Sequence, residues 1–180
     1  ATVSESFPTN FSIYNLPEFL GATSLLEDPD FEFGESSLSI ADNNSKLAYY
    51  YASEGMVVAP DKMITMPDAE ISFKVTSTLL GDLQKASSVL GVNDLVLESD
   101  GTTVSLTVSD KKNAASNTFS RVVGQGDGTK YSMNFKIENL KILTGNYDVS
   151  VSSKGISHFK NTDIDLEYFI ALEPDSKYGS

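Results

Sequence analysis

The sequence is poorest in the residues that most often carry out chemistry. Its 180 residues include no cysteine, one histidine and one arginine. The absence of cysteine excludes disulfides, thiolate metal sites and a cysteine nucleophile, which fits an intracellular protein. The single histidine, His158, lies between Ile156 and Phe159 in an alternating segment, and no second histidine exists to complete a metal site or a catalytic pair. We therefore expect His158 to be a strand residue, and we expect neither an enzyme nor a bound cofactor or metal.

Positive charge and long apolar runs are also scarce. Lysine and arginine together number 13 against 25 carboxylates, which gives a net charge of −12. Such a surface repels nucleic acid at long range, so it disfavours a module that grips DNA through phosphate contacts but not a protein that encircles DNA. No apolar run approaches the roughly 20 residues of a membrane span. Residues 1–10 have neither a starting methionine nor a signal pattern, so we expect a processed start or a part of a longer chain.

What the sequence does contain is a globular composition, with 40% hydrophobic residues, and one clear strand–helix–strand pattern. Residues 71–75 alternate apolar and polar side chains, as a half-buried strand does. Between residues 79 and 90 apolar residues recur every three or four positions, the stripe of a helix lying on a sheet. A Thr-Ser pair can cap the helix start, Gly91 stands where a helix normally stops, and residues 94–97 return as a strand.

The same order occurs three times. A phenylalanine opens each copy, at positions 11, 73 and 135, so successive copies are 62 residues apart. The first copy predicts a strand at residues 11–13, a helix and a strand at 31–33; the third predicts a strand at 135–137, a helix around 140–143 and a strand at 147–149. The first and third copies also share the pattern F-x-I-x-N-L. Equal spacing favours a duplicated half-domain, although unrelated α+β segments can follow a similar order.

Further strands and loops surround these copies. Alternating or β-prone segments predict strands at residues 37–42, 46–52, 102–108, 117–124, 131–137, 149–153, 156–159 and 164–172. Residues 55–67 hold two prolines and no period, which predicts an extended connector or a loop that buries its apolar residues locally. The glycine-rich residues 124–128 lack phosphate-loop spacing and predict a hairpin loop. Carboxylates alternate along residues 163–167, where a solvated strand face is expected rather than a weak divalent-ion site.

Several stretches resemble a known family. Residues 10–33 (NFSIYNLPEFLGATSLLEDPDFEF) and 55–67 (GMVVAPDKMITMP) are similar to the region before the linker and to the connector of the DNA polymerase sliding clamp of T-even bacteriophages. Residues 144–155 (TGNYDVSVSSKG) and 168–176 (YFIALEPDS) are similar to its C-terminal strands and tail. The similarity runs in order along most of the chain, and none of these motifs is catalytic.

The resemblance implies an α+β fold of the DNA-clamp type. Such a fold repeats strand-helix-strand half-domains, two per domain, with antiparallel sheets outside and helices on one face. A subunit of the phage clamp has four half-domains, whereas this chain shows three. Residues 1–55 are therefore expected to form the C-terminal half of a first domain whose other half is missing, 56–67 the connector, and 68–180 a complete second domain. An unpaired sheet edge is expected near residues 11–14.

The resemblance also implies a function and a set of site residues. It implies a processivity factor in the cytoplasm of an infected host cell, away from any membrane, which encircles duplex DNA topologically and tethers the replicative polymerase, the clamp loader and other partners. Lys85 and Lys141 are the candidate DNA-facing lysines, although Lys85 also fits an ordinary surface position on a helix. The implied subunit interface, between copies that form a trimer if the ring closes, joins Lys46, Ala48 and Tyr50 of one copy to Phe119, Arg121 and Val123 of the next. The implied pocket for partner peptides consists of Val57, Val58, Ala59, Pro60, Ile170, Leu172 and Pro174.

Another class of protein fits part of these observations. An acidic, cysteine-free chain rich in serine, threonine and asparagine is common among β-rich structural or adhesive components of virions and cell surfaces. That reading makes the helices incidental and predicts evenly spaced strands, so the 62-residue repeat disfavours it. A carbohydrate- or ion-binding module is a weaker alternative, because it needs clustered aromatics or carboxylates in loops.

Overall fold

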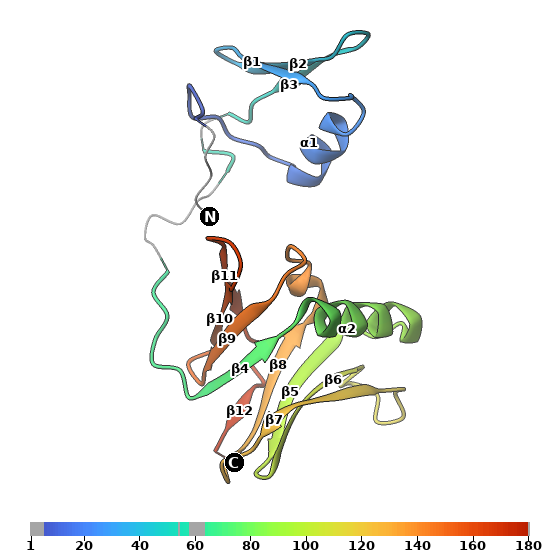
Figure 1. The fold of residues 1–180 in the computed structure, drawn as a ribbon, viewed down its shortest axis with the longest axis vertical. Helices are drawn as coiled ribbons and strands as arrows, with labels where there is room; N and C mark the ends of the chain where they lie inside the picture. The colour runs from blue at the N-terminus through green and yellow to red at the C-terminus, as the bar shows by residue number, and fades with distance from the viewer. Residues whose placement is uncertain (1–5, 54, 58–63, 180) are drawn as a thin grey trace. The chain divides into compact units, whose positions relative to one another are not determined.

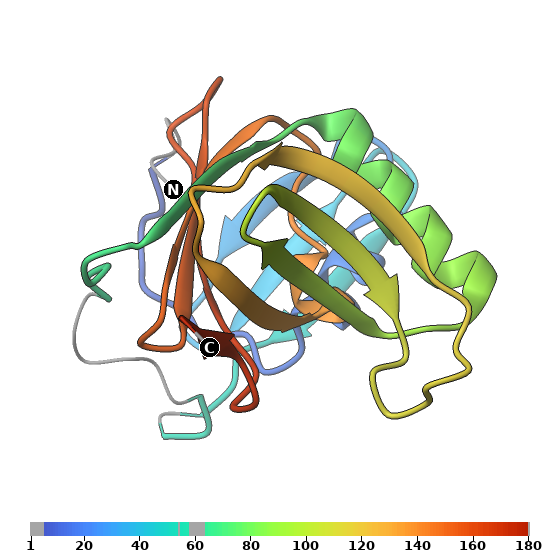
Figure 2. The ribbon, with the colours of Figure 1, turned by 90° about the horizontal axis from the view of Figure 1, so that it is seen from below.

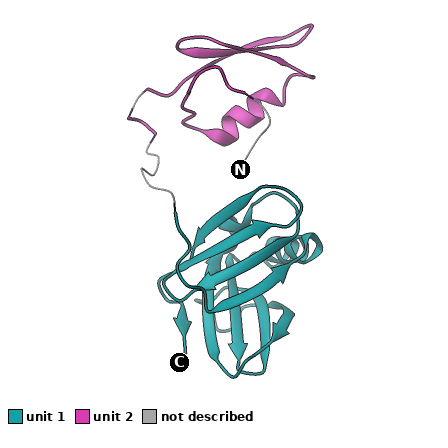
Figure 3. Ribbon diagram, turned by 60° about the vertical axis from the view of Figure 1, so that its left-hand side comes forward, with its two compact units in different colours: residues 1–2, 64–180 teal, residues 3–63 magenta. Residues whose placement is uncertain are grey.

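The computed structural model describes residues 6–53, 55–57 and 64–179. The chain divides between residues 63 and 64 into two compact units, which we call unit 2 (before this point) and unit 1 (after it), as Figure 3 shows. The division falls within the segment 56–67 that the sequence predicts to be a connector. Which domain halves of a clamp the two units represent stays a prediction.

The described part of unit 2 contains one helix and a three-stranded antiparallel sheet. Its elements are α1 (Leu16–Thr23), β1 (Asp30–Phe33), β2 (Ser37–Ala41) and β3 (Lys46–Tyr50), with the sheet order β1-β2-β3. The side chain of Asn15 caps α1 by accepting a hydrogen bond from the Glu18 N–H, and a proline occupies the first turn. The small core contains Leu26, Leu38 and Ile40, and α1 itself contributes no fully buried residue.

The strand predicted at residues 11–13 does not form. The described residues give this stretch one backbone hydrogen bond, from the N–H of Ala52 to the carbonyl of Ser12. A strand exists only where a neighbouring strand satisfies its backbone groups, and an alternating side-chain pattern does not provide that neighbour. This part of the prediction was therefore wrong, although the helix and the strand that follow it were correctly placed.

Unit 1 contains two sheets and one long helix (Figure 1). In chain order its elements are β4 (Ile71–Val75), α2 (Ser77–Leu90), β5 (Asp94–Asp100), β6 (Thr103–Ser109), β7 (Phe119–Gln125), β8 (Lys130–Lys136), the 3-10 turn η1 (Ile137–Leu140), β9 (Tyr147–Ser152), β10 (Ile156–Asn161), β11 (Glu167–Ala171) and β12 (Lys177–Tyr178). One sheet has the order β11-β10-β9-β4 and the other β12-β8-β5-β6-β7. Apolar residues of both sheets and of α2 form a single core.

The two halves of unit 1 exchange their first strands. β4 precedes α2 but pairs with β9 of the other half, while β8 pairs with β5 of the first half (Figure 2). At both exchanges a lysine follows the repeated phenylalanine and meets an aspartate across the strands: Lys74 with Asp148, and Lys136 with Asp94. The repeat predicted from the phenylalanine spacing is therefore a structural repeat in this unit.

The helix predicted after the third phenylalanine is only the 3-10 turn η1. Its two buried residues, Ile137 and Leu140, are three positions apart, which matches the three residues per turn of this helix type. Too few residues separate β8 from β9 for a helix of the length of α2. Lys141 consequently follows a single turn and does not lie on an α-helix as predicted.

Two other local predictions were wrong. Residues 124–128 do not close a hairpin, because β7 and β8 lie on opposite sides of the β5–β6 pair. The loop crosses the end of that pair, where Gly126 donates to the Thr102 carbonyl at 2.8 Å and a side chain would clash with Gly101. The last long strand begins at Glu167, and residues 162–165 form bends, so their carboxylates do not share a strand face.

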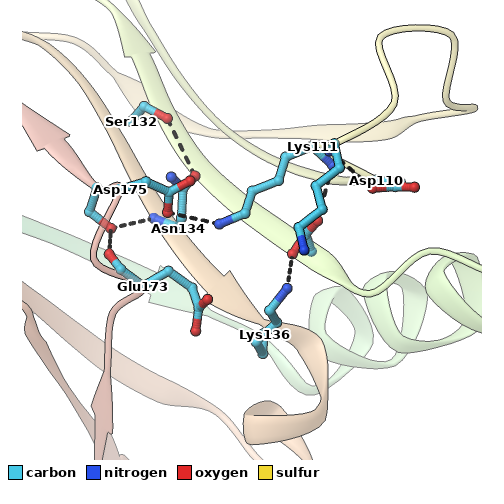
Figure 4. A network of polar contacts seen from close by, with 10 residues as sticks. Asp110, Lys111, Ser132, Asn134, Lys136, Glu173 and Asp175 are labelled. Atoms are coloured by element: carbon cyan, nitrogen blue, oxygen red, sulfur yellow. Dashed lines mark hydrogen bonds and ion pairs between the residues drawn. The ribbon is translucent and has the colours of Figure 1, made fainter.

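The C-terminal segment is fastened to the edge of β8 by a polar network (Figure 4). Lys111 Nζ contacts Asp175 Oδ1 at 2.8 Å. The backbone N–H of Asn134 donates to Ser176 Oγ at 2.9 Å, and its carbonyl accepts from the Glu173 N–H at 2.8 Å. Because β12 then pairs with β8, this side of the five-stranded sheet is covered by the chain itself.

Candidate functional surfaces

The outer side of α2 carries the first candidate lysine. Leu80, Leu83 and Ser87 are buried against the sheets, so the opposite side of the helix faces solvent. Lys85 lies on that opposite side and is exposed, and Lys141 is exposed after η1. Both positions are compatible with phosphate contacts, and their role in DNA binding stays a prediction.

A polar groove lies between α2 and η1. Gln84 Nε2 donates to the Leu140 carbonyl at 2.7 Å and so holds the two segments side by side. The groove has a volume of about 560 Å³, and its polar lining includes Ser88, Asn93, Glu138 and Lys141. Gln84 could not be selected from the sequence, since a single glutamine on a helix follows no recognisable motif.

The predicted interface residues lie on two edge strands. Lys46, Ala48 and Tyr50 of β3 point away from the core of unit 2, and the exposed fraction of Tyr50 is 74%. β7 is the edge of the five-stranded sheet. The exposed fraction of Val122 on β7 is 70%, although this residue is not among those predicted for the interface.

The inner face of β7 forms a notch with α2. Phe119 and Val123 pack against the core, and Arg121 extends across Phe119, with its guanidinium carbon 5.2 Å from the ring centre. Arg121 also forms an ion pair with Asp82 of α2 at 3.1 Å. The notch has a volume of about 350 Å³, and its apolar lining includes Ala86, Val89, Leu90 and Phe119.

The residues predicted to bind partner peptides are not equally accessible. Ile170 and Leu172 belong to the core of unit 1, with exposed fractions of 6% and 8%. Pro174 is exposed in unit 1 and Val57 is exposed in unit 2. Val58, Ala59 and Pro60 lie outside the described residues. The side chains of Ile170 and Leu172 are therefore not presented to solvent, and the role of this set in peptide binding stays a prediction.

The perturbed carboxyl groups have structural explanations. Burial opposes ionisation of Asp94, but the hydrogen bond from Lys136 and the N–H of Lys111 outweigh it and hold the pKa of Asp94 below its ordinary value. Hydrogen bonds from Thr103 and Thr102 lower the pKa of Asp100 to about 2 in the β5–β6 turn. Within the described ranges, no three acidic or histidine side chains are grouped as metal ligands. No described helix has the length and apolarity to cross a membrane.

Known proteins share both the sequence and the fold. Residues 72–174 match the family described as gp45 sliding clamp, C terminal. The sliding clamp of Vibrio phage KVP40 is 33% identical over 96% of this chain and 80% of its own length. The sliding clamp of Enterobacteria phage T4 is 29% identical over 99% of this chain and 81% of its own length.

The fold comparison extends beyond phages. The β subunit of the DNA polymerase of Streptococcus pyogenes has a TM-score of 0.63 at 14% identity, covering 96% of this chain and 49% of its own. At this identity the likeness concerns the fold, and it confirms the predicted α+β clamp architecture. Given a family match over more than half of the chain and a relative one third identical along nearly all of it, the chain belongs to the gp45 family of phage sliding clamps, the processivity factors of DNA replication.

Proposed function

We propose that this chain assembles with copies of itself into a closed ring around duplex DNA, and that the ring tethers the polymerase without catalysing a reaction. The ring holds DNA because it is closed, so it needs few contacts with phosphates. This mechanism suits a chain with a net charge of −12. We further propose that assembly takes place in the cytoplasm of the infected cell, with three copies per ring and opening by a clamp loader.

The observation that carries this proposal is the character of two edge strands. Free edges normally carry charges that prevent association, as Asp30 and Glu32 do on β1 and Glu167 does on β11. Among the edge strands of the described residues, only β3 and β7 lack carboxylates and also carry an apolar side chain exposed by 70% or more, namely Tyr50 and Val122. These edges have the composition of strands that pair with another chain.

Pairing of β3 with β7 joins two different surfaces. Such a heterologous contact repeats from copy to copy and closes into a ring if the rotation between copies allows it. The pairing brings together both sets of predicted interface residues, Lys46, Ala48 and Tyr50 with Phe119, Arg121 and Val123. Val122 joins them as an additional contact on the outer face.

The remaining surfaces take the roles that the family suggests. Lys85 on the outer side of α2 and Lys141 after η1 contact DNA phosphates weakly. Partner peptides dock on the surface of unit 1 that includes the exposed Pro174, close in sequence to the buried Ile170 and Leu172, and Val57 of unit 2 is a further candidate contact. An extended apolar peptide beside a strand end is a common mode of recognition.

The mass in solution tests the ring. Light scattering from dilute to concentrated protein should give one discrete closed oligomer, expected to be a trimer. Val122→Asp should raise the dissociation constant of the oligomer by about tenfold or more, because a charge would then be desolvated at the interface between β3 and β7. Ile164→Asp is the matched control, since Ile164 is 58% exposed on the loop between β10 and β11, which belong to a different sheet from β7. A monomer at all concentrations would rule out a self-assembled ring.

A further inference from the structure

The surfaces beside the two free edges differ in charge. Between residues 6 and 57 the only basic side chain is Lys46, against eight carboxylates, so the surface of unit 2 is acidic. The notch of unit 1 carries Lys85 and the single arginine of the chain, Arg121. This complementarity points to a second copy of the same chain as the occupant of the notch.

The acidic side of α1 lies next to β3. A depression of about 460 Å³ is lined by residues of both elements, including Tyr14, Glu18 and Tyr50. Tyr14 is 72% exposed. Glu18 is exposed and forms no ion pair with the described residues, so its carboxylate is available to a neighbour. Leu16 and Leu20 lie on the opposite side of the helix from Glu18, because they are two positions away from it.

Edge pairing places this side of α1 against the notch. Phe19 of α1 packs on Tyr49 at 5.1 Å, so α1 covers the inner face of β3. Asp82 of α2 pairs with Arg121, so α2 covers the inner face of β7. If the two edges join in one sheet with both buried faces on the same side, α1 of one copy lies beside α2 of the next.

We propose that Glu18 of one copy forms an ion pair with Arg121 of the next copy, while Tyr14 enters the apolar notch beside Val89. Arg121 has five N–H donors in a planar fork, so it can bind Asp82 and Glu18 together. Val89 is 75% exposed, and an aromatic ring above it removes apolar surface from water at both partners. This contact fixes which edges pair and in which register, and it rests on the proposed ring.

Charge reversal tests the pair. Glu18→Arg and Arg121→Glu should each raise the dissociation constant by about tenfold, measured by light scattering over a concentration series. The double variant should recover most of the lost affinity, because the new arginine then lies between Asp82 and the introduced glutamate. Tyr14→Ala should weaken association to a similar extent. It should not lower the melting temperature of the isolated chain, since the aromatic side chain of Tyr14 is exposed there.

Two controls separate this contact from general charge effects. Glu32→Arg makes the same charge change on β1, at the other edge of the same sheet, and should leave association unchanged. Asp82→Asn removes the partner within the chain but leaves Arg121 for Glu18, and it should not weaken association. If the unmodified chain never associates, the proposed ring is wrong. If it associates and the double variant is no better than the single ones, the ring stands but this ion pair does not.

Discussion

At the scale of single residues, the two lysine–aspartate pairs offer an internal comparison. Both occupy the same place in the exchanged strands of unit 1, but their surroundings differ. The side chains of Lys74 and Asp148 are 82% and 59% exposed, whereas that of Asp94 is 5% exposed beneath Lys136. Water screens the first pair and is largely excluded from the second, so the same chemical pair should contribute differently to stability.

We predict that Asp94→Asn lowers the free energy of unfolding by about 2 kcal/mol, because it removes the negative charge beside Lys136 and leaves one amide oxygen for two donors, Lys136 Nζ and the N–H of Lys111. Asp148→Asn, the matched control at the exposed position, should change stability by less than about 0.5 kcal/mol. Denaturant unfolding of the three proteins at neutral pH measures both values.

The pH dependence of the unfolding free energy tests whether the charge of Asp94 causes this loss of stability. The pKa of Asp94 is lower in the folded chain than in the unfolded one, where it is about 3.9. Its contribution is therefore complete above that unfolded value and is lost as the pH falls through the lowered folded value. The difference in unfolding free energy between the unmodified chain and Asp94→Asn should become smaller below about pH 4. A difference that stays constant down to that range would mean that packing, not charge, explains the loss.

At the scale of elements, α2 was predictable because its signals are local. The Thr76 side chain accepts from the Leu79 N–H, and Gly91 ends the helix at a φ of +66°. The strand at residues 11–13 and the form of η1 were not predictable, because both depend on what lies nearby in space. Residues 11–13 have the same alternation as β4 and β8, but among the described residues no strand pairs with them as β9 pairs with β4 and β5 with β8. The apolar spacing after residue 136 does not distinguish a 3-10 turn from an α-helix.

Replacing glycine with alanine should have opposite effects on stability at Gly81, inside α2, and at Gly91, the residue that ends it. Gly91→Ala should destabilise unit 1 by about 1 kcal/mol, because a side chain is strained at positive φ. Gly81→Ala should stabilise it by about 0.5–1 kcal/mol, since Gly81 is in the exposed helix interior with nothing within 4 Å of the added carbon. Thermal unfolding of both variants measures the pair. If both variants changed stability in the same direction, the space around the helix, rather than the backbone conformation, would determine the effect of the added carbon.

The candidate sites divide in the same way. Tyr50, Arg121 and Lys85 were selected because the resemblance implied edge strands and exposed helix faces. The structure places Tyr50 and Arg121 on edge strands and Lys85 on the outer side of α2, and their roles stay predictions. The burial of Ile170 and Leu172 could not be predicted, since it results from contacts between two sheets. Val122 was missed for a related reason: a run of two valines does not reveal which one faces the core until the bulge beside Val104 and Ser105 is known.

At the scale of the whole molecule, a strongly negative net charge is compatible with a role on DNA if the ring is held there by topology. A protein that held DNA through six to ten phosphate contacts would lose about 10³–10⁵ in affinity between 50 and 200 mM salt. A closed ring leaves DNA only by opening or by sliding off an end, so phosphate contacts are not required to retain it. The charge of −12 then limits adhesion between the ring and the DNA that passes through it.

We therefore predict that rings trapped on DNA are held by its topology. Linear duplex is incubated with the protein and circularised by ligation, and the bound fraction is followed by gel filtration. Dwell time on the circles should fall by less than about threefold from 50 to 200 mM salt, because phosphate contacts contribute little to retention. One cut by a restriction enzyme should release the protein at either salt concentration. Steep loss of protein from intact circles as salt rises would instead show that electrostatic contacts hold it, and the ring would then be open or incomplete.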